Sequence, residues 1–196
     1  RQGKTTFLRV LAGLARPSSG SVTIHNPKPL TPQAARGGIG YLSHDTALYA
    51  DLTALENLHF YARLLGLPSA DTELEKRIQS VGLSGREREP VRNYSRGMQQ
   101  RLAIARAFLH DPTILLLDEP FTGLDHAGTS FLKEYLAGER SCGKTCIMAI
   151  HDASLGYELA DRLIVLEKGL VALDLRKKSV SLEAFQDRYR ALATEC

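Results

Sequence analysis

The chain has 196 residues, of which 43% are hydrophobic and 24% charged, the balance of one ordinary soluble domain with an ample core. Its 25 basic side chains barely exceed its 22 acidic ones, so charge gives no reason to expect a nucleic-acid partner. No window approaches about eighteen uninterrupted apolar residues, and Lys4 and Arg9 break the first apolar run. We therefore expect neither a membrane span nor a signal peptide. Three cysteines without zinc-ribbon spacing are expected to be reduced thiols of a cytosolic protein (Cys142, Cys146 and Cys196).

Apolar periodicity and turn residues predict the elements of the first half of the chain. In chain order these are a helix over 4–14, a strand over 21–25, a short buried strand over 39–42, a helix over 53–65 and a helix over 71–81. Thr53 and Glu56 form the capping box that opens the fourth of these elements. Residues 82–94 read as a polar, charged linker.

The second half alternates helices and strands more regularly. We expect helices over 98–109, 128–138, 154–160 and 182–192, and strands over 114–117, 145–150, 162–167 and 170–173. The apolar run 114–117, between Pro112 and Asp118, is typical of a strand buried on both faces. This alternation predicts an α/β fold with a mostly parallel sheet flanked by helices. Residues 53–93 hold helices without strands, which indicates an inserted helical lobe outside the sheet.

The beginning of the chain carries a candidate phosphate site. Gly3, Lys4 and Thr5 fill the last three places of the loop G-x-x-x-x-G-K-[ST], in which a lysine and backbone N–H groups bind phosphates; Thr6 follows in the first turn of the expected helix. The opening glycine and the strand before it would then lie upstream of Arg1. A Gly-Lys pair before two threonines can also simply open a surface helix, so this motif alone leaves both interpretations open.

A second motif follows the buried strand over 114–117. Asp118 and Glu119 come at its end, and the carboxyl edge of a parallel sheet is where α/β folds bind ligands. Asp118 can hold Mg²⁺ through water while Thr5 supplies a direct oxygen, and Glu119 can polarise an attacking water. The alternative is a strand that ends in an acidic turn, which the Gly-Lys-Thr segment upstream disfavours.

A third motif opens the helix over 98–109. Ser95 and Gly97 stand at its start, where a hydroxyl, free backbone N–H groups and the helix dipole favour a phosphate. Ser95 can serve as an ordinary N-cap at the same time. Its local role does not explain the order of motifs along the chain, which continues with Gly123-Leu124-Asp125 and with His151 after another buried strand.

That order resembles the ATP-binding subunit of ABC transporters over nearly the whole chain, so that residues 1–196 would be one truncated ABC ATP-binding domain of the P-loop NTPase fold. Residues 95–98 resemble the family's signature, residues 122–125 its D-loop, and His151 its switch histidine. The resemblance implies ATP hydrolysis with Mg²⁺ in a homodimer that sandwiches two ATP molecules. Each ATP would lie between the phosphate loop of one protomer and the signature helix of the other, with Asp125 nearby, Glu119 and His151 as catalytic residues, and His151 contacting the γ-phosphate.

Four positions depart from the family pattern. Arg1 stands where the phosphate loop usually has a glycine, so either the loop is degenerate or the chain does not start natively. Arg96 replaces the first signature glycine and Met98 the glutamine; Arg96 can add charge to the phosphate contact or point to solvent. His44 takes the place of the Q-loop glutamine, which touches Mg²⁺ or water, and we count it among the nucleotide-site residues. The upstream aromatic residue that stacks on adenine is also missing.

Residues 52–63 are similar to the matching helix start in the haem-exporter ATP-binding subunit of cytochrome c maturation. This predicts a peripheral subunit on the cytoplasmic face of the cell membrane, bound to an integral membrane permease. Alternatives are the ATPase of a multidrug or polysaccharide-type exporter, a soluble ABC ATPase of translation or DNA repair, and a catalytically dead partner subunit. We expect Phe60 to belong to the core of the lobe and Tyr49, in an exposed loop, to dock the permease.

Overall fold

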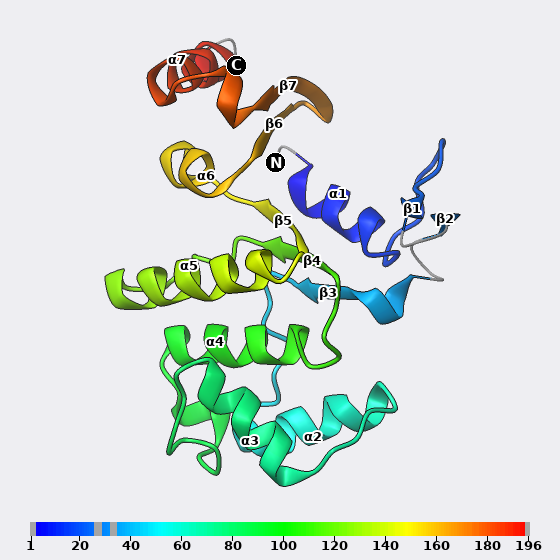
Figure 1. The fold of residues 1–196 in the computed structure, drawn as a ribbon, viewed down its shortest axis with the longest axis vertical. Coiled ribbons are helices and arrows are strands. Elements are labelled where there is room, and N and C mark those ends of the chain that lie inside the picture. Colours follow the sequence, from blue (N-terminus) through cyan, green and yellow to red (C-terminus); the bar gives the residue numbers. More distant parts are fainter. Residues whose placement is uncertain (1–2, 26–28, 32–34, 195–196) are drawn as a thin grey trace.

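The computed structural model describes residues 3–25, 29–31 and 35–194, so the predictions made for Arg1 and Cys196 lie outside the described residues. Figure 1 shows an elongated arrangement in three parts. A helical part with α2 (Ala54–Leu64) and α3 (Asp71–Ser80) lies at one end. A sheet lies in the middle, and a strand pair with the last helix, α7 (Leu182–Thr194), lies at the other end.

The central sheet has three parallel strands in the order β3 (Ile39–Leu42), β4 (Ile114–Asp118) and β5 (Thr145–Ala149). This confirms the predicted parallel sheet and places the most apolar strand in its centre. Because successive side chains of a strand point to opposite faces, β4 supplies Leu115 and Leu117 to one core cluster and Leu116 to the other.

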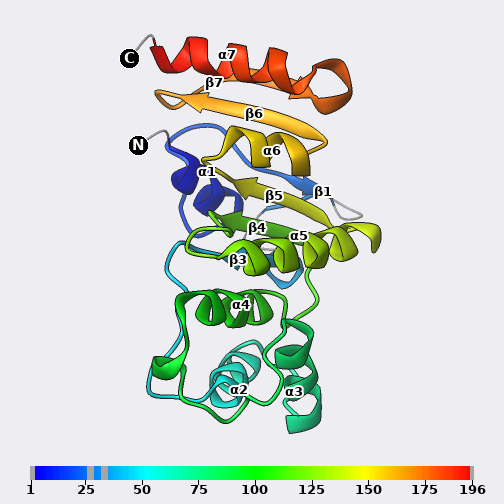
Figure 2. The same ribbon diagram turned by 90° about the vertical axis from the view of Figure 1, so that its left-hand side faces the viewer.

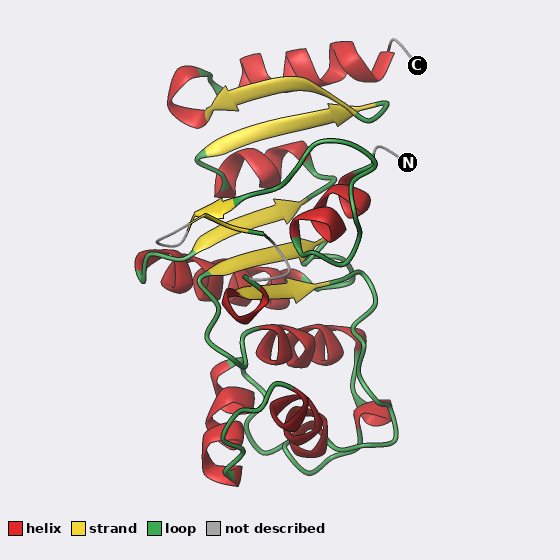
Figure 3. Cartoon of the chain, turned by 90° about the vertical axis from the view of Figure 1, so that its right-hand side faces the viewer, coloured by secondary structure: helices red, strands yellow, loops and turns green. Residues whose placement is uncertain are grey.

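Helices cover both faces of this sheet. Leu8 of α1 (Lys4–Leu11) packs in the cluster that contains Leu116, and Figure 3 shows α1 on that face. Leu132 of α5 (His126–Ser141) belongs to the cluster of Leu115, and Figure 2 shows α5 on the opposite face. Between the sheet and the helical part lies α4 (Arg96–Ala107), whose apolar side chains join the same cluster as Leu115.

Two predicted elements near the start of the chain are shorter than expected. The helix predicted over 4–14 ends at Leu11, because Gly13 adopts a left-handed conformation (φ 68°) and Leu14 N–H then donates to the Arg9 carbonyl. The strand predicted over 21–25 is only β1 (Ile24–His25), which pairs antiparallel with an unpredicted strand, β2 (Pro29–Leu30).

Residues 53–93 contribute α2, α3 and a short 3₁₀ helix, η2 (Val91–Asn93), and no strand. The predicted capping box is confirmed: Glu56 N–H donates to Thr53 Oγ1 and Thr53 N–H donates to Glu56 Oε2. The two ends of the segment are held together, since Val91 N–H donates to the Leu52 carbonyl at 2.9 Å. That this segment is an inserted lobe stays a prediction.

The expectation that Phe60 is core is wrong. Its side chain is 41% exposed, and it packs edge-on against two other aromatic rings at the surface of α2, those of Tyr49 at 4.9 Å and Tyr61 at 5.2 Å between centroids. Leu55 and Leu58 on the opposite side of the helix fill the core instead. Tyr49 itself is 48% exposed, in agreement with the exposed loop expected for it.

The C-terminal part follows α6 (Ala153–Leu159) and consists of β6 (Arg162–Glu167), β7 (Leu170–Arg176), a 3₁₀ turn η3 (Lys177–Ser179) and α7. Lys168 and Gly169 both have positive φ and reverse the chain, so β6 and β7 form an antiparallel pair rather than extending the parallel sheet. Among the residues that the structure describes, no helix is both long and apolar enough to cross a membrane.

Candidate functional site

Three side chains from distant parts of the chain meet at the carboxyl edge of the central sheet. Lys4 Nζ lies 3.2 Å from His151 Nδ1, and His151 Nε2 lies 2.6 Å from Glu119 Oε1. Lys4 Nζ also donates to the Ile150 carbonyl at 3.3 Å. An ammonium can only donate, so this chain of contacts fits an imidazole that accepts at Nδ1 and donates its Nε2 proton to the carboxylate.

Local backbone conformation aims the lysine at this edge. Gly3 adopts φ 82° as the N-cap of α1, a left-handed conformation that side-chain-bearing residues rarely take, and α1 begins directly after it. Burial lowers the pKa of Lys4 below its ordinary value, although the negative charges of Glu119 and Asp118 oppose that shift. Thr5 and Thr6 lie exposed in the first turn of α1.

Glu119 is held in an unusual conformation directly after β4. Its φ of 54° is left-handed for a non-glycine residue, which costs on the order of 1 kcal/mol and is often found at functional sites. Its N–H donates to the Ala149 carbonyl of β5, and Thr122 Oγ1 donates to its Oε2 at 3.2 Å. Burial opposes ionisation, but His151 and Thr122 outweigh it and hold the pKa of Glu119 below its usual value.

Asp118 is almost fully buried, with 1% of its surface exposed, and no described residue donates a hydrogen bond to its Oδ2 atom. A buried carboxylate oxygen without a partner is costly, and a bound cation would satisfy it. No group of three or more His, Cys, Asp or Glu side chains in the described chain could hold a metal. One carboxylate and one hydroxyl nevertheless suit Mg²⁺, which keeps several waters and shares phosphate oxygens.

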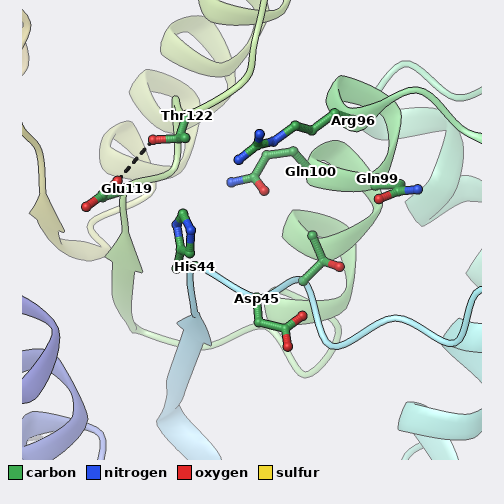
Figure 4. Close-up of a pocket in the computed structure, with 8 residues that line it drawn as sticks. His44, Asp45, Arg96, Gln99, Gln100, Glu119 and Thr122 are labelled. Atoms are coloured by element: carbon green, nitrogen blue, oxygen red, sulfur yellow. Dashed lines mark hydrogen bonds between the residues drawn. The ribbon is translucent and has the colours of Figure 1, made fainter.

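A polar pocket of about 350 Å³ adjoins Glu119. His44, which follows β3, points into the space between the start of α4 and the loop after β4 (Figure 4). The residues that line this pocket are His44, Asp45, Thr46, Arg96, Gln99, Gln100, Glu119 and Thr122.

The other predicted site residues make local contacts in the single chain. Ser95 is the N-cap of α4 and accepts from Met98 N–H, while Asp125 is the N-cap of α5 and accepts from Gly128 N–H at 2.7 Å. A Cβ atom added at Gly97 would meet Leu124 Cδ2 at an ordinary 3.7 Å. Among the described residues, no hydrogen bond joins these positions to Lys4, whereas Lys4, Glu119 and His151 are joined directly.

Two contacts that support the loop after β4 were not predicted from the sequence. Thr122 bonds the Glu119 carboxylate, and the buried Gln100 of α4 donates to the Pro120 carbonyl at 3.0 Å. The three-residue spacing from Glu119 to Thr122, typical of a turn, was a usable signal for the first contact. For Gln100 there was none, because its partner is a backbone oxygen twenty residues away.

The fold and this edge define an α/β ATPase domain of the phosphate-loop class. The family model described as ABC transporter matches residues 2–122, and the chain belongs to this family.

Characterised and uncharacterised relatives agree on that assignment. The chain is 36% identical to the uncharacterised ABC transporter ATP-binding protein YdbJ of Bacillus subtilis over 183 residues, which are 92% of this chain and 58% of YdbJ. It is 36% identical to the Nod factor export ATP-binding protein I of Cupriavidus metallidurans, over 85% of this chain and 56% of that protein. The chain thus spans a little over half the length of these relatives.

Solved structures share the fold. The ATP-binding cassette MJ0796, in a dimeric post-hydrolysis state bound to ADP and Pi, matches with a TM-score of 0.80 and 27% identity over 90% of this chain and 81% of that chain. The cbiO1 protein of Clostridium perfringens, part of the ABC transporter complex cbiONQ, matches with a TM-score of 0.77 and 28% identity over 97% of this chain and 79% of its own.

Proposed function

We propose that this chain is the ATP-hydrolysing domain of an ABC transporter subunit. The observation that carries the proposal is the convergence of Lys4, His151 and Glu119 at one sheet edge, next to the buried Asp118. A fixed cation that binds phosphate and a carboxylate that accepts a proton are groups that phosphoryl transfer to water uses, and the imidazole between them holds the carboxylate.

Each group has a task that its surroundings suit. Gly3 and the first turn of α1, with Thr5 and Thr6, offer backbone N–H groups to phosphate oxygens, and Lys4 adds positive charge. Glu119 is kept ionised by its neighbours, so it can accept a proton from the attacking water. His151 holds the Glu119 carboxylate in place and presents its ring where a γ-phosphate can be contacted.

Thr5 and Asp118 are the residues that would hold Mg²⁺, and His44, which lines the pocket beside Glu119, is a candidate to contact the ion or its water from the Q-loop position. When bound, Mg²⁺ neutralises phosphate charge. The unpartnered Oδ2 atom of Asp118 supports this assignment.

The second half of the nucleotide site would come from another copy of the chain. Ser95, Gly97 and Asp125 lie at helix starts, where free N–H groups favour phosphate, and they are not joined to Lys4 by contacts within one chain. We therefore propose a homodimer with two shared ATP sites, bound to an integral membrane permease at the cytoplasmic face of the cell membrane. Residues 53–93 would form the lobe that docks this permease.

Mixed dimers of the full-length protein test the shared site. When Lys4→Ala protomers combine with Ser95→Arg protomers, one site receives both defects and the other receives neither. Each variant alone should be nearly inactive in ATP hydrolysis, and the mixture should recover part of the wild-type rate. If heterodimers are shown to form and no activity returns, the shared-site model is wrong; if wild type itself does not hydrolyse ATP, the proposed function is wrong.

For the cargo, the segment 52–63 supports the haem exporter of c-type cytochrome biogenesis. A second candidate is an exporter of a different cargo, favoured by the 36% identity to a protein named for Nod factor export. A strain that lacks the gene distinguishes them, because c-type cytochromes bind haem covalently. Loss of haem staining of these cytochromes on denaturing gels is expected for the haem exporter, and unchanged staining contradicts it.

A further inference from the structure

The side chain of Arg96, the first residue of α4, lies against Gly123 in the loop after β4. A Cβ atom built on Gly123 would sit 2.6 Å from Arg96 Nε, 2.7 Å from Cδ and 3.2 Å from Cγ. Real Cβ atoms do not approach other atoms so closely, so the stem of Arg96 covers the Cα atom of Gly123. Gly123 also has φ 78°, a second reason why this position suits glycine.

The Arg96 contact is one of three between the start of α4 and residues 120–124. Gln100 donates to the Pro120 carbonyl, and Gly97 faces Leu124 closely enough that an added methyl would touch it. The same loop carries Glu119 at its beginning and Thr122, which bonds Glu119, in its middle. These contacts join the start of α4 directly to the loop that carries Glu119.

The sequence left two roles open for Arg96, a contact with phosphate and a side chain that points to solvent. The direction of its side chain favours a third role, a contact with the loop after β4. Its guanidinium extends from α4 into the pocket, toward the loop that carries Glu119 and Thr122 (Figure 4). It forms no ion pair with any residue that the structure describes. Its aliphatic stem is thus the part with a defined contact.

We propose that Arg96 is a positioning residue that acts within its own chain: its stem holds the loop 119–125 so that Glu119 is correctly placed for hydrolysis. The inference rests on the proposed function and deepens it. It also makes the signature helix of each protomer part of two sites. Ser95 and Gly97 would act on the ATP of the partner, whereas Arg96 would act on the Glu119 of the same protomer.

The contact itself can be tested without nucleotide or dimer. Gly123→Ala introduces the same left-handed strain whether or not Arg96 is present, but the clash occurs only with Arg96. The thermal midpoint should therefore fall further for Gly123→Ala in the wild-type background than in the Arg96→Ala background, by about 3 °C or more, the shift of roughly 1 kcal/mol in a domain of this size. Equal falls in both backgrounds would overturn the contact.

The catalytic consequence requires the full-length ATPase. Arg96→Ala should leave ATP affinity within about twofold and slow single-turnover hydrolysis by about 10-fold, since small displacements of a catalytic group are costly. Arg96→Met keeps an uncharged stem and should restore most of the rate. If only Arg96→Lys restores it, the charge matters rather than the stem, and the proposal fails. Arg188→Ala, an exposed arginine of α7, controls for arginine removal and should have no effect.

Mixed dimers decide whether Arg96 acts within its own chain. A dimer of one Arg96→Ala protomer and one Glu119→Gln protomer keeps a single intact Glu119, in the same chain as the altered Arg96. Its single-turnover rate should be about 10-fold below that of a wild-type/Glu119→Gln dimer, matching the homodimer defect. Equal rates would place the action of Arg96 in the partner's site and overturn the proposal. A wild-type protein that hydrolyses no ATP would instead overturn the proposed function and leave the midpoint test decisive.

Discussion

The edge of the sheet and the helical segment 53–93 are built in opposite ways. At the edge, Lys4, Glu119 and His151 meet across more than a hundred residues of sequence through charged, partly exposed contacts. In the helical segment, apolar side chains of α2 and α3 fill the core, with Leu58 and Ile78 completely buried. Partly exposed ion pairs contribute little to stability, whereas buried apolar side chains contribute most of it.

Because of this difference, we expect catalysis and stability to depend on different residues. Substitutions at the edge should change catalysis and leave the unfolding midpoint nearly unchanged. Substitutions in the helical segment should change the midpoint and leave the chemistry of each folded molecule unchanged. Helix α4 connects the two regions. Its apolar side chains belong to the main core cluster, and Gln100 near its start donates to the Pro120 carbonyl in the loop that follows Glu119.

The largest expected effect is on catalysis at the edge. Glu119→Gln keeps the size of the side chain and can still accept from Thr122, but it removes the proton-accepting carboxylate. ATP hydrolysis by the full-length protein should fall by roughly 10²-fold or more, the scale of a lost general base. ATP binding should persist, and the ATP-bound dimer should accumulate, which size-exclusion chromatography with ATP measures.

The midpoint of Glu119→Gln provides the control, and it should remain within a few degrees of wild type. A near-normal rate would remove Glu119 from this role. A large fall in midpoint would instead mean that the edge is part of the folding core, and the separation of chemistry from folding would be wrong.

The next effect belongs to the helical segment. Asn57 is fully buried in α2 and joins it to the preceding loop: its Oδ1 accepts from Tyr49 N–H at 2.8 Å, and its Nδ2 donates to the carbonyls of Tyr49 and Thr53. Asn57→Ala removes these three bonds and leaves Tyr49 N–H without its partner, whereas the carbonyls of Tyr49 and Thr53 still accept from Leu52 N–H and from the backbone N–H of residue 57. The free energy of unfolding should fall by about 2–3 kcal/mol, measured by urea denaturation.

Asn93→Ala is the matched control, because Asn93 is exposed in η2 and its truncation should cost less than about 0.5 kcal/mol. The rate of hydrolysis per folded molecule of Asn57→Ala should stay near that of wild type. A selective loss of hydrolysis at temperatures where the variant is fully folded would show that the two regions are more tightly coupled than their contacts suggest.

Sequence patterns were sufficient where one local rule decided the structure. The capping box of Thr53 and Glu56 and the apolar strand 114–117 both form as expected. Helix ends were less predictable: the stop at Leu11 depends on the left-handed conformation of Gly13, which competes with the helical spacing of Leu14. The neighbouring strands predicted over 162–167 and 170–173 both form, but their separation from the central sheet was not foreseen, because alternation of strands and helices does not reveal pairing partners.

In the candidate site, too, local patterns predicted some side-chain positions and not others. The chemistry of Lys4, Glu119 and His151 could be inferred from the order of motifs, because parallel strands bring their carboxyl ends to one edge. The position of Arg96 could not, since both solvent and phosphate fit its charge. It depends on the absence of a side chain at Gly123, a contact between the start of a helix and a loop that no periodic pattern encodes.

Only a small effect on stability is expected for Tyr49, at the surface where the helical segment meets the loop after β3. Its ring packs against Phe60, which lines a groove of about 570 Å³ on α2 together with Glu56, His59, Arg63 and Leu64. Tyr49→Ala removes an exposed aromatic contact worth about 0.5–1 kcal/mol, while Asn57 still holds the backbone. Co-purification with the permease should nevertheless fall clearly.

The control is Leu170→Ala, which truncates an exposed apolar residue at the far end of the molecule and should leave the yield of co-purified permease unchanged. The comparison is pull-down yield against thermal midpoint on the same preparations. A fall of several degrees without specific loss of partner would assign Tyr49 to the core and place the docking surface elsewhere on the helical segment.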